Sequence, residues 1–252
     1  MDLKRYYDKV GELGIKDSDF KRFDFVYNHI LPKKDLLDVG CGCGEWLEYL
    51  LEKNENNLAG CDISKVRLES AKESLKNKVS LSLSDILSLD YVDNSFKQTT
   101  ALETIEHIPE WKKGINELLR VSSERVVITV PYDENLKFEI CNCGEKAYLY
   151  GHLHSFKEKD FDYLKKQNLN LSFEKIKNPK SSEYYVKRLL NFISRKTKPE
   201  KEKSTSGHSN ITICPSCYEK VPYSKYYERM RDRVFRIMFN KPEYLLVELN
   251  KN

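Results

Sequence analysis

Long apolar runs are absent from this sequence of 252 residues. No stretch approaches the ~20 consecutive apolar residues that a helix needs to cross a bilayer, so we expect no membrane-spanning segment. The N-terminal stretch, residues 1–6, also lacks the basic and then apolar pattern of a secretory signal. We therefore expect the protein to remain in the cytoplasm.

A large excess of charge is also absent, because the formal net charge is only +4 at pH 7. So mild a charge does not by itself indicate binding to nucleic acid. The excess of basic residues lies between about residues 187 and 236, and we interpret it as a solvated face. The length suits one large α/β domain with an insertion or a small appendage.

The cysteines do not predict a disulfide framework. There are seven, an odd number, and some are grouped as Cys-x-Cys and Cys-x-x-Cys. In a reducing compartment such groups are typical of metal ligands or of small buried residues.

Strand-like and helix-like segments alternate along most of the chain, which predicts a parallel, doubly wound α/β sheet. With the last two strands, we expect seven in a mostly parallel arrangement. The strands are predicted at residues 36–39, 58–63, 79–84, 99–102, 126–130, 169–176 and 244–249. The main helices are predicted at residues 17–30, 45–53, 65–77, 111–121 and 157–167.

An irregular segment, residues 179–240, interrupts this alternation. It contains a stretch at 194–210 that we predict to be a mobile linker, a Cys-x-x-Cys pair and an amphipathic helix expected at 224–239. We therefore divide the chain into a domain of residues 1–178 and 241–252 and an inserted lid, residues 179–240, on the substrate side.

Glycines at positions 40, 42 and 44 come directly after a predicted strand and before a predicted helix. Glycines in this position let the backbone turn tightly and approach a ligand that a side chain would exclude. Asp62 ends the next strand, about 20 residues further on, where a carboxylate can accept hydrogen bonds from both hydroxyls of a ribose. Asp85 follows the third strand, where it can bind an adenine amino group while Ile86 packs on the ring.

Four segments together resemble the ordered motifs of class I S-adenosylmethionine-dependent methyltransferases, namely residues 37–44, 60–64, 84–86 and 101–108. The resemblance implies a Rossmann-like fold and methyl transfer from S-adenosyl-L-methionine. It also implies that Asp38 and the glycines hold the methionine end of this cofactor. The residues expected to bind it are Asp38, Gly40, Cys41, Gly42, Gly44, Asp62, Ile63, Asp85, Ile86 and Glu103.

A dinucleotide-binding dehydrogenase is the rival interpretation of the glycine run. It predicts a further glycine three positions after Gly42, but that position is Glu45. A carboxylate at the start of a helix repels a pyrophosphate, so Glu45 favours a sulfonium nucleoside over a dinucleotide.

Three histidines are candidates for the general base, because a hydroxyl acceptor has to lose a proton and histidine titrates near neutrality. His107 follows the fourth strand at the carboxyl edge of the sheet, where ligands bind in open α/β sheets. His152 and His154 begin the segment that comes after the fifth strand.

The sequence Glu-x-x-Glu-His, formed by Glu103, Glu106 and His107, also resembles the metal-binding motif of small-RNA 2′-O-methyltransferases. Those enzymes add a histidine from a later loop, a place that His152 or His154 could take. In this alternative a divalent ion binds the terminal hydroxyls of the RNA. In the other interpretation, Glu103 contacts the cofactor while Glu106 and His107 order the loop.

The methyl acceptor is expected to be a small polar molecule, methylated on oxygen or nitrogen. The Asn-Pro-Pro-Tyr type of sequence that accompanies methylation of bases and amides is absent from the slot after the fourth strand. Tyrosines between residues 184 and 227 suggest a sugar or glycan precursor. Nucleic acid is the less expected substrate, and a cofactor-binding scaffold without catalysis is the remaining alternative.

Two pairs of cysteines have the spacing of zinc ligands: Cys141 and Cys143, and Cys214 and Cys217. Four thiolates suffice for a closed tetrahedral site. The pairs are far apart in sequence, and they can share one structural Zn²⁺ if the loop after the fifth strand meets the connection between the last two strands. The two segments meet only if the last strand runs antiparallel to the others, as the resemblance to class I methyltransferases implies.

The remaining cysteines, Cys41, Cys43 and Cys61, are expected to be small packing residues around the glycine run and the second strand.

Overall fold

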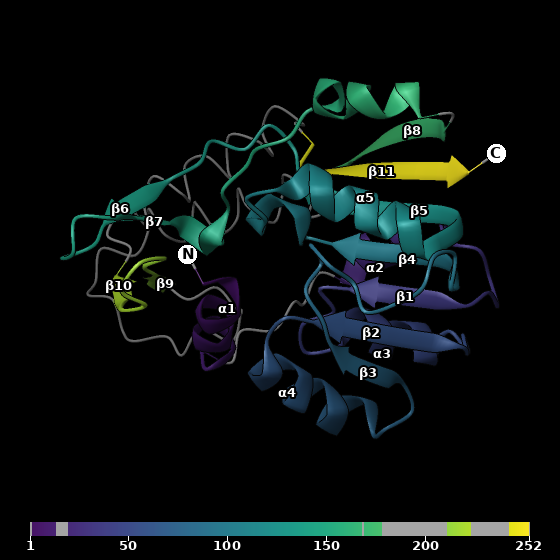
Figure 1. Cartoon of the computed structure of the whole chain (residues 1–252), viewed down its shortest axis with the longest axis horizontal. Helices are drawn as coiled ribbons and strands as arrows, with labels where there is room; N and C mark the ends of the chain where they lie inside the picture. Colours follow the sequence, from purple (N-terminus) through teal and green to yellow (C-terminus); the bar gives the residue numbers. More distant parts are fainter. Residues whose placement is uncertain (1, 14–19, 168, 178–210, 223–241, 252) are drawn as a thin grey trace, which may run out of the picture.

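The computed structural model describes residues 2–13, 20–167, 169–177, 211–222 and 242–251 (Figure 1). Seven strands in this part of the chain form one sheet, in the order β3-β2-β1-β4-β5-β11-β8. Their bounds are β1 (Leu36–Val39), β2 (Leu58–Asp62), β3 (Ser80–Leu83), β4 (Phe96–Leu102), β5 (Ser122–Pro131), β8 (Leu169–Ile176) and β11 (Tyr244–Lys251).

The strand directions confirm the predicted fold class. Strands β1 to β5 are parallel, whereas β11 pairs antiparallel with both β5 and β8, with Val247 opposite Ile128 and Phe173. Strand β5 begins at Ser122, earlier than predicted, because its polar start still pairs within the sheet: Arg125 is in register with Asn250. The carboxyl ends of β1 to β5 meet at one edge.

Helices cover both faces of the sheet. On one face, α2 (Phe20–Tyr27), α3 (Glu45–Glu52) and α4 (Lys65–Leu75) contribute to one buried apolar cluster. On the other face, α5 (Trp111–Val121) and η3 (Glu158–Lys166) contribute to a second. The segment predicted as an ordinary helix at 157–167 is the 3₁₀ helix η3, whose buried Phe161 and Leu164 are three residues apart, as the 3₁₀ period requires.

Several short elements were not predicted. They are the helix α1 (Leu3–Gly11), the 3₁₀ turns η1 (Ile105–His107) and η2 (Leu149–Gly151), and two antiparallel hairpins. One hairpin pairs β6 (Phe138–Ile140) with β7 (Lys146–Tyr148), and the other pairs β9 (Ile211–Ile213) with β10 (Lys220–Pro222). Strands of three residues are too short to show a clear alternation of apolar and polar positions.

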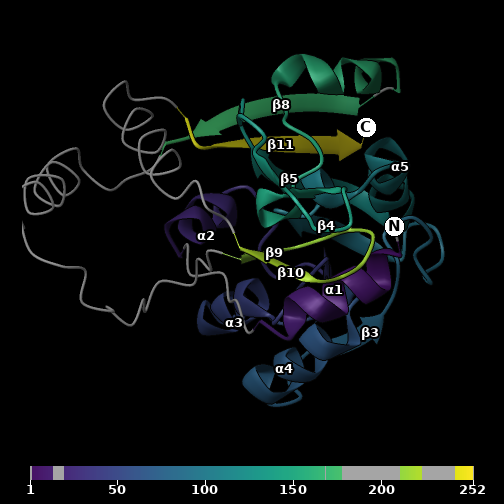
Figure 2. The ribbon, with the colours of Figure 1, turned by 90° about the vertical axis from the view of Figure 1, so that its left-hand side faces the viewer.

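The two hairpins and α1 lie together beyond the carboxyl edge of the sheet (Figures 1 and 2). Helix α1 lies between β9 and α4, and it contacts both. The linker predicted at 194–210 and the helix predicted at 224–239 lie outside the described residues. Among the helices that are described, none combines the length and the apolar character needed to cross a membrane.

Candidate active site

The glycine run forms a turn whose backbone angles favour glycine. Gly40, Gly42 and Gly44 have φ angles of 76°, 57° and 87°, in the left-handed region that disfavours side chains. At Gly40 a Cβ atom would also lie 2.5 Å from the side chain of Thr104. The amide of Gly40 donates a hydrogen bond to the carbonyl of Cys61 (2.8 Å), which ties the turn to β2.

Asp62 fixes this turn from the neighbouring strand. Its carboxylate is buried, and it accepts hydrogen bonds from the amides of Gly42 (2.9 Å) and Ser64 (2.8 Å). A carboxylate offers about four acceptor positions, so two remain for a ligand. Asp62 therefore has the geometry expected of a ribose-binding residue and also orders the start of α4.

Asp38 is a buried acid at the end of β1. The hydroxyl of Thr100 donates to its carboxylate (2.7 Å). Burial raises the pKa of Asp38 to about 7, the Thr100 bond opposes this change, and the nearby charges of Asp62 and Glu45 add to it. A cationic group bound here would favour the charged carboxylate, as expected for the ammonium of a methionine moiety.

Asp85 lies two residues after the end of β3, so the three predicted acids lie in or just after adjacent strands of the sheet. Its carboxylate accepts a hydrogen bond from the amide of Leu87 (2.9 Å). Ile86 is buried in the core, close to Gly114 of α5, and Ile63 packs against the apolar cluster of α1.

The cysteines of this region are packing residues, as predicted. Cys41, Cys43 and Cys61 are all buried, and Sγ of Cys41 would lie 3.1 Å from a Cβ atom placed on Gly60 in β2.

Glu103 follows β4 with an unusual backbone. Its φ angle is 52°, and one carboxylate oxygen lies 3.5 Å from a guanidinium nitrogen of the buried Arg22. Burial raises the pKa of Glu103, and the charge of Arg22 opposes that shift. The sequence offered no signal for Arg22, which reaches Glu103 from α2.

Glu106, His107 and His152 form a compact group, which we call the Glu106 cluster. The Nε2 atoms of His107 and His152 lie 3.8 and 3.9 Å from Oε1 of Glu106. Glu106 is fully buried, and neither carboxylate oxygen has a hydrogen-bond partner among the described residues. Burial raises its pKa well above the usual value, and the charge of Glu103 adds to this.

The outer nitrogens of both histidines are anchored. Nδ1 of His107 lies 3.2 Å from the carbonyl oxygen of Gly151, and Nδ1 of His152 lies 2.6 Å from a carboxylate oxygen of Glu134. Because these oxygens accept hydrogen bonds, Nδ1 is the donor of each ring in these contacts, and Nε2 is the nitrogen that lies nearer to Glu106. Such outer partners are typical of histidines that bind a metal ion.

His154 is not part of this cluster. Its Nε2 donates to the carbonyl of Ile108 (3.0 Å), and its ring lies near Trp111 and Phe156. Its backbone amide, 3.2 Å from the carbonyl of Glu106, helps to order the loop. The structure therefore brings together two of the three candidate bases.

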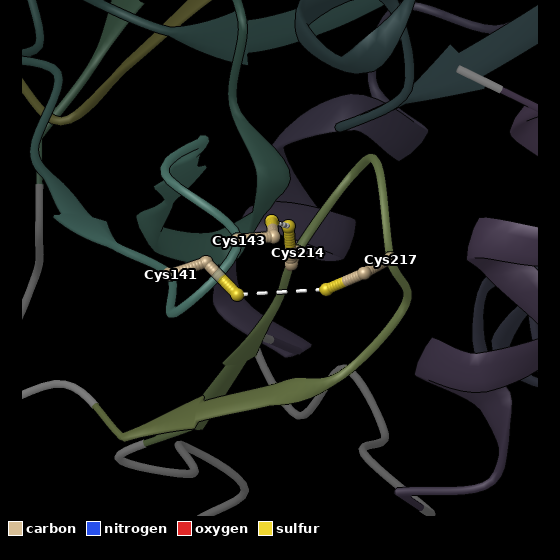
Figure 3. Close-up of side chains that lie close together, drawn as sticks. All are labelled: Cys141, Cys143, Cys214 and Cys217. Carbon is tan, nitrogen blue, oxygen red and sulfur yellow. Dashed lines mark hydrogen bonds between the residues drawn. The ribbon is translucent and has the colours of Figure 1, made fainter.

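The four predicted zinc ligands converge, and we call them the four-cysteine cluster (Figure 3). The Sγ atoms of Cys141 and Cys217 are 3.5 Å apart, as are those of Cys143 and Cys214, and all four lie within 4.8 Å of one another. A disulfide requires about 2.05 Å. A tetrahedral zinc with bonds of about 2.3 Å would separate its sulfurs by about 3.8 Å, close to the observed arrangement.

Each half of this cluster sits in a similar hairpin turn. The amide of Gly144 donates to the carbonyl of Cys141 (2.8 Å), and the amide of Tyr218 donates to that of Cys214 (3.0 Å). Gly144 and Tyr218 both have positive φ angles, 91° and 62°. The turns thus direct two thiols each toward the same point.

Tyr7 is a site residue that the sequence analysis missed. Its ring lies edge-on to His107 with centroids 5.8 Å apart, and its buried hydroxyl has no hydrogen-bond partner in the described part of the chain. The available signal was the helical spacing of Leu3, Tyr6, Tyr7 and Val10. Glu134, the partner of His152, had no comparable signal.

The sequence matches known methyltransferases in its first half. Residues 36–124 match a family model described as a methyltransferase domain. The chain is 31% identical to methyltransferase GfsG of Streptomyces halstedii over 121 residues, which is 45% of this chain and 42% of that protein. It is 30% identical to norajmaline N-methyltransferase of Rauvolfia serpentina over 115 residues, 43% of this chain and 39% of that one. The match spans less than half the length of either relative.

Solved structures resemble the whole chain. The [4+2]-cyclase SpnF has a TM-score of 0.65 at 17% identity, over 99% of this chain and 94% of that one. Geranyl diphosphate C-methyltransferase from Streptomyces coelicolor A3(2), in complex with S-adenosyl-L-homocysteine, has a TM-score of 0.60 at 12% identity, over 93% and 78%. At these identities the likeness shows the fold, which is that of Rossmann-like methyltransferases, and not the reaction.

The raised pKa of Asp38 predicts that the stability of the folded protein depends on pH. Between the unfolded value of 3.8 and about 7, the folded chain keeps a proton that the unfolded chain has released. The free energy of unfolding should therefore fall as pH rises through this window, by up to about 1.4 kcal/mol per pH unit from this group. Urea unfolding without ligand measures this free energy at pH 5 and at pH 7. The fall between the two pH values should be smaller for Asp38→Asn than for the wild type. The exposed Asp35→Asn is the control and should behave like the wild type.

Proposed function

We propose that this chain is an S-adenosylmethionine-dependent methyltransferase. The observation that carries the proposal is the glycine turn held by Asp62 beside Asp38 and Asp85, at the carboxyl ends of adjacent strands. The methyltransferase-domain match covers all of these residues. The relatives, which include an N-methyltransferase, are named as methyltransferases and support methyl transfer.

The residues of this edge suit the parts of the cofactor. Asp38, whose pKa of about 7 reflects an uncompensated buried acid, suits the ammonium of the methionine end. Asp62 keeps acceptor positions for the ribose, and Asp85 with Ile86 would contact the adenine. When bound, S-adenosylmethionine supplies a methyl carbon already activated by a sulfonium. The protein then has chiefly to align the acceptor with that carbon.

We assign proton removal from the acceptor to His152 rather than to His107. Burial lowers the pKa of His107 to about 3, so its imidazole is a weak base at neutral pH. Nδ1 of His152 is held by Glu134, which leaves Nε2 as the acceptor of a proton and would stabilise the imidazolium that forms. His154, held by the carbonyl of Ile108, would order the loop.

The acceptor is proposed to be a small polar molecule methylated on oxygen or nitrogen, with sugars and glycan precursors as the first class to test. The named relatives support small-molecule substrates without selecting one. They include norajmaline N-methyltransferase and a probable tocopherol O-methyltransferase from Oryza sativa subsp. japonica.

The four-cysteine cluster is proposed to bind one structural Zn²⁺. The spacing of its sulfurs suits a tetrahedral ion. They come from two hairpins that also meet through a small buried cluster, which includes Ala147 and Val221, and through a hydrogen bond from Thr212 to the carbonyl of Tyr148. A closed site with four protein ligands has no position for substrate, so the ion would act on folding and not on catalysis.

A second candidate function is methyl transfer assisted by a divalent ion at the Glu106 cluster, as in an RNA 2′-O-methyltransferase. The favouring observation is the convergence of the Nε2 atoms of His107 and His152 on a buried carboxylate that has no hydrogen-bond partner in the described structure. Glu103, which the sequence motif includes, instead lies beside Arg22.

Replacement of Asp62 tests the cofactor site. Asp62→Asn should weaken the binding of S-adenosylhomocysteine at least tenfold, because an amide NH₂ group cannot accept a hydrogen bond that is worth roughly 1.5 to 3 kcal/mol to a charged acceptor. Isothermal calorimetry measures the effect, and the exposed Asp90→Asn is the control. Unchanged affinity in Asp62→Asn would remove this residue from the site. Failure of the folded wild type to bind would reject the proposed function.

Metal analysis tests the zinc proposal. The purified chain should contain about one zinc, and Cys141→Ser should lose most of it because three thiolates bind the ion less tightly. Cys61→Ala, at a buried cysteine outside the cluster, should retain zinc although its stability falls by on the order of 1 kcal/mol. Full zinc content in Cys141→Ser would contradict a site shared by the two hairpins.

Manganese binding tests the second candidate, because thiolate sites disfavour Mn²⁺. If the Glu106 cluster holds a divalent ion, calorimetry should detect Mn²⁺ binding, which Glu106→Gln should weaken more than tenfold. Glu134→Gln, which alters only the partner of His152, should weaken it by about 10 to 100-fold. Absence of Mn²⁺ binding to the folded wild type would remove this candidate.

A further inference from the structure

We propose that metal in the four-cysteine cluster controls cofactor affinity through helix α1, which it holds closed over the cofactor edge of the sheet. The inference rests on the proposed function and on the proposed zinc site. It goes beyond both, because neither the cofactor site nor the zinc site requires that binding at one site changes the affinity of the other.

On its inner side α1 contacts the residues that shape the cofactor site. The carboxylate of Asp8 accepts a hydrogen bond from the hydroxyl of Ser64 (2.8 Å). The amide of Ser64 in turn donates to Asp62. Tyr7 lies edge-on to His107, and Gly11 lies against Arg67 of α4. Ser64 lies two residues after Asp62, the proposed ribose-binding acid. A shift of α1 that moved Ser64 would therefore disturb Asp62.

On its outer side α1 contacts residues adjacent to the cysteines. Ile213, next to Cys214, is buried against Tyr6 and Tyr7. The hydroxyl of Tyr218, next to Cys217, accepts a hydrogen bond from the amide of Asp2 (3.1 Å).

Two further contacts strengthen this outer side. The guanidinium carbon of Arg5 lies 4.4 Å from the centre of the Tyr218 ring. Burial raises the pKa of Tyr6 to about 12, and the side chain of Thr212, which precedes Ile213 in β9, opposes this shift. The outer contacts of α1 described here thus lie within three residues of a proposed zinc ligand.

Neither α1 nor the β9–β10 hairpin is long enough to hold this position alone. Strands β9 and β10 have three residues each, and a two-stranded hairpin is at best marginally stable in water. A helix of nine residues is also marginal by itself. The two hairpins also meet through the hydrogen bond from the hydroxyl of Thr212 to the carbonyl of Tyr148 (2.6 Å) and through a small buried cluster. A metal bridge between the cysteine pairs would add to these contacts and strengthen the hold of Ile213 and Tyr218 on α1.

The first experiment measures the coupling in the full chain. Calorimetric titration with S-adenosylhomocysteine should show about tenfold weaker binding after zinc is removed by a chelator, within the usual range of coupling between sites. By linkage, S-adenosylhomocysteine should raise the zinc affinity by the same factor, measured by competition with a chromophoric chelator. Equal affinities with and without zinc, or a chain that binds no zinc, would overturn the proposal.

The zinc-free chain could unfold, so two matched variants in β9 test the contact with α1 without removing zinc. Both variants retain all four cysteines. Ile213→Ala, at a side chain that is 2% exposed, should keep its zinc and bind S-adenosylhomocysteine several-fold more weakly than the wild type. Ile211→Ala, at a side chain that is 37% exposed, should bind it like the wild type. An unchanged affinity in Ile213→Ala, or an equal loss in both variants, would contradict transmission through α1.

Hydrogen exchange separates failure of the coupling from failure of the proposed function. Amides of α1 should exchange faster in the zinc-free chain and in Ile213→Ala, while those of β1 and β4 remain protected. This readout needs no cofactor. If S-adenosylhomocysteine does not bind but α1 still responds to zinc, the proposed function fails and the zinc-dependent position of α1 stands. If α1 exchanges equally in both forms, the inference fails.

Discussion

The carboxylate of Asp62 is the contact on which the candidate cofactor site depends. One oxygen holds the amide of Gly42 in the glycine turn, and the other holds the amide of Ser64 at the start of α4. Both bonds are buried, where hydrogen bonds to a charged acceptor are strongest. The acid that is expected to bind the ribose therefore also sets the shape of the surface on which a nucleoside would lie.

A shortage of positive charge characterises the rest of this edge. Asp38 and Glu106 are buried and Glu103 is partly buried, and for each of these acids desolvation is the main cause of a raised pKa. The charge of Arg22, 3.5 Å from Glu103, opposes the raised pKa of Glu103 and also that of Glu106. Such an arrangement costs stability in the empty protein and favours cationic ligands, because each bound cation restores the charged form of a carboxylate. A sulfonium cofactor with an ammonium group has this character, and so does a divalent ion at the Glu106 cluster.

The segments beyond the sheet connect the proposed zinc to this edge. The two cysteine hairpins are too small to have a core of their own, and α1 lies between one of them and α4. Tyr6, Tyr7 and Asp8 make contacts in both directions within a single turn of helix. Neighbouring side chains on α1 thus connect the cysteine hairpin to the candidate cofactor site, although the two would bind different ligands.

The sequence by itself determined the fold class and the glycine and aspartate framework, because alternating strands and helices and a glycine-rich turn leave local patterns that do not depend on distant contacts. It also indicated the two pairs of thiols from their spacing. Only the tertiary structure decided that the pairs meet, since 70 residues separate Cys143 from Cys214 and their meeting follows from an antiparallel β11. The same holds for His152 joining His107 while His154 turns to Ile108, and for α1 closing over Ser64. Those contacts are set by packing between elements remote in sequence, for which no local pattern exists.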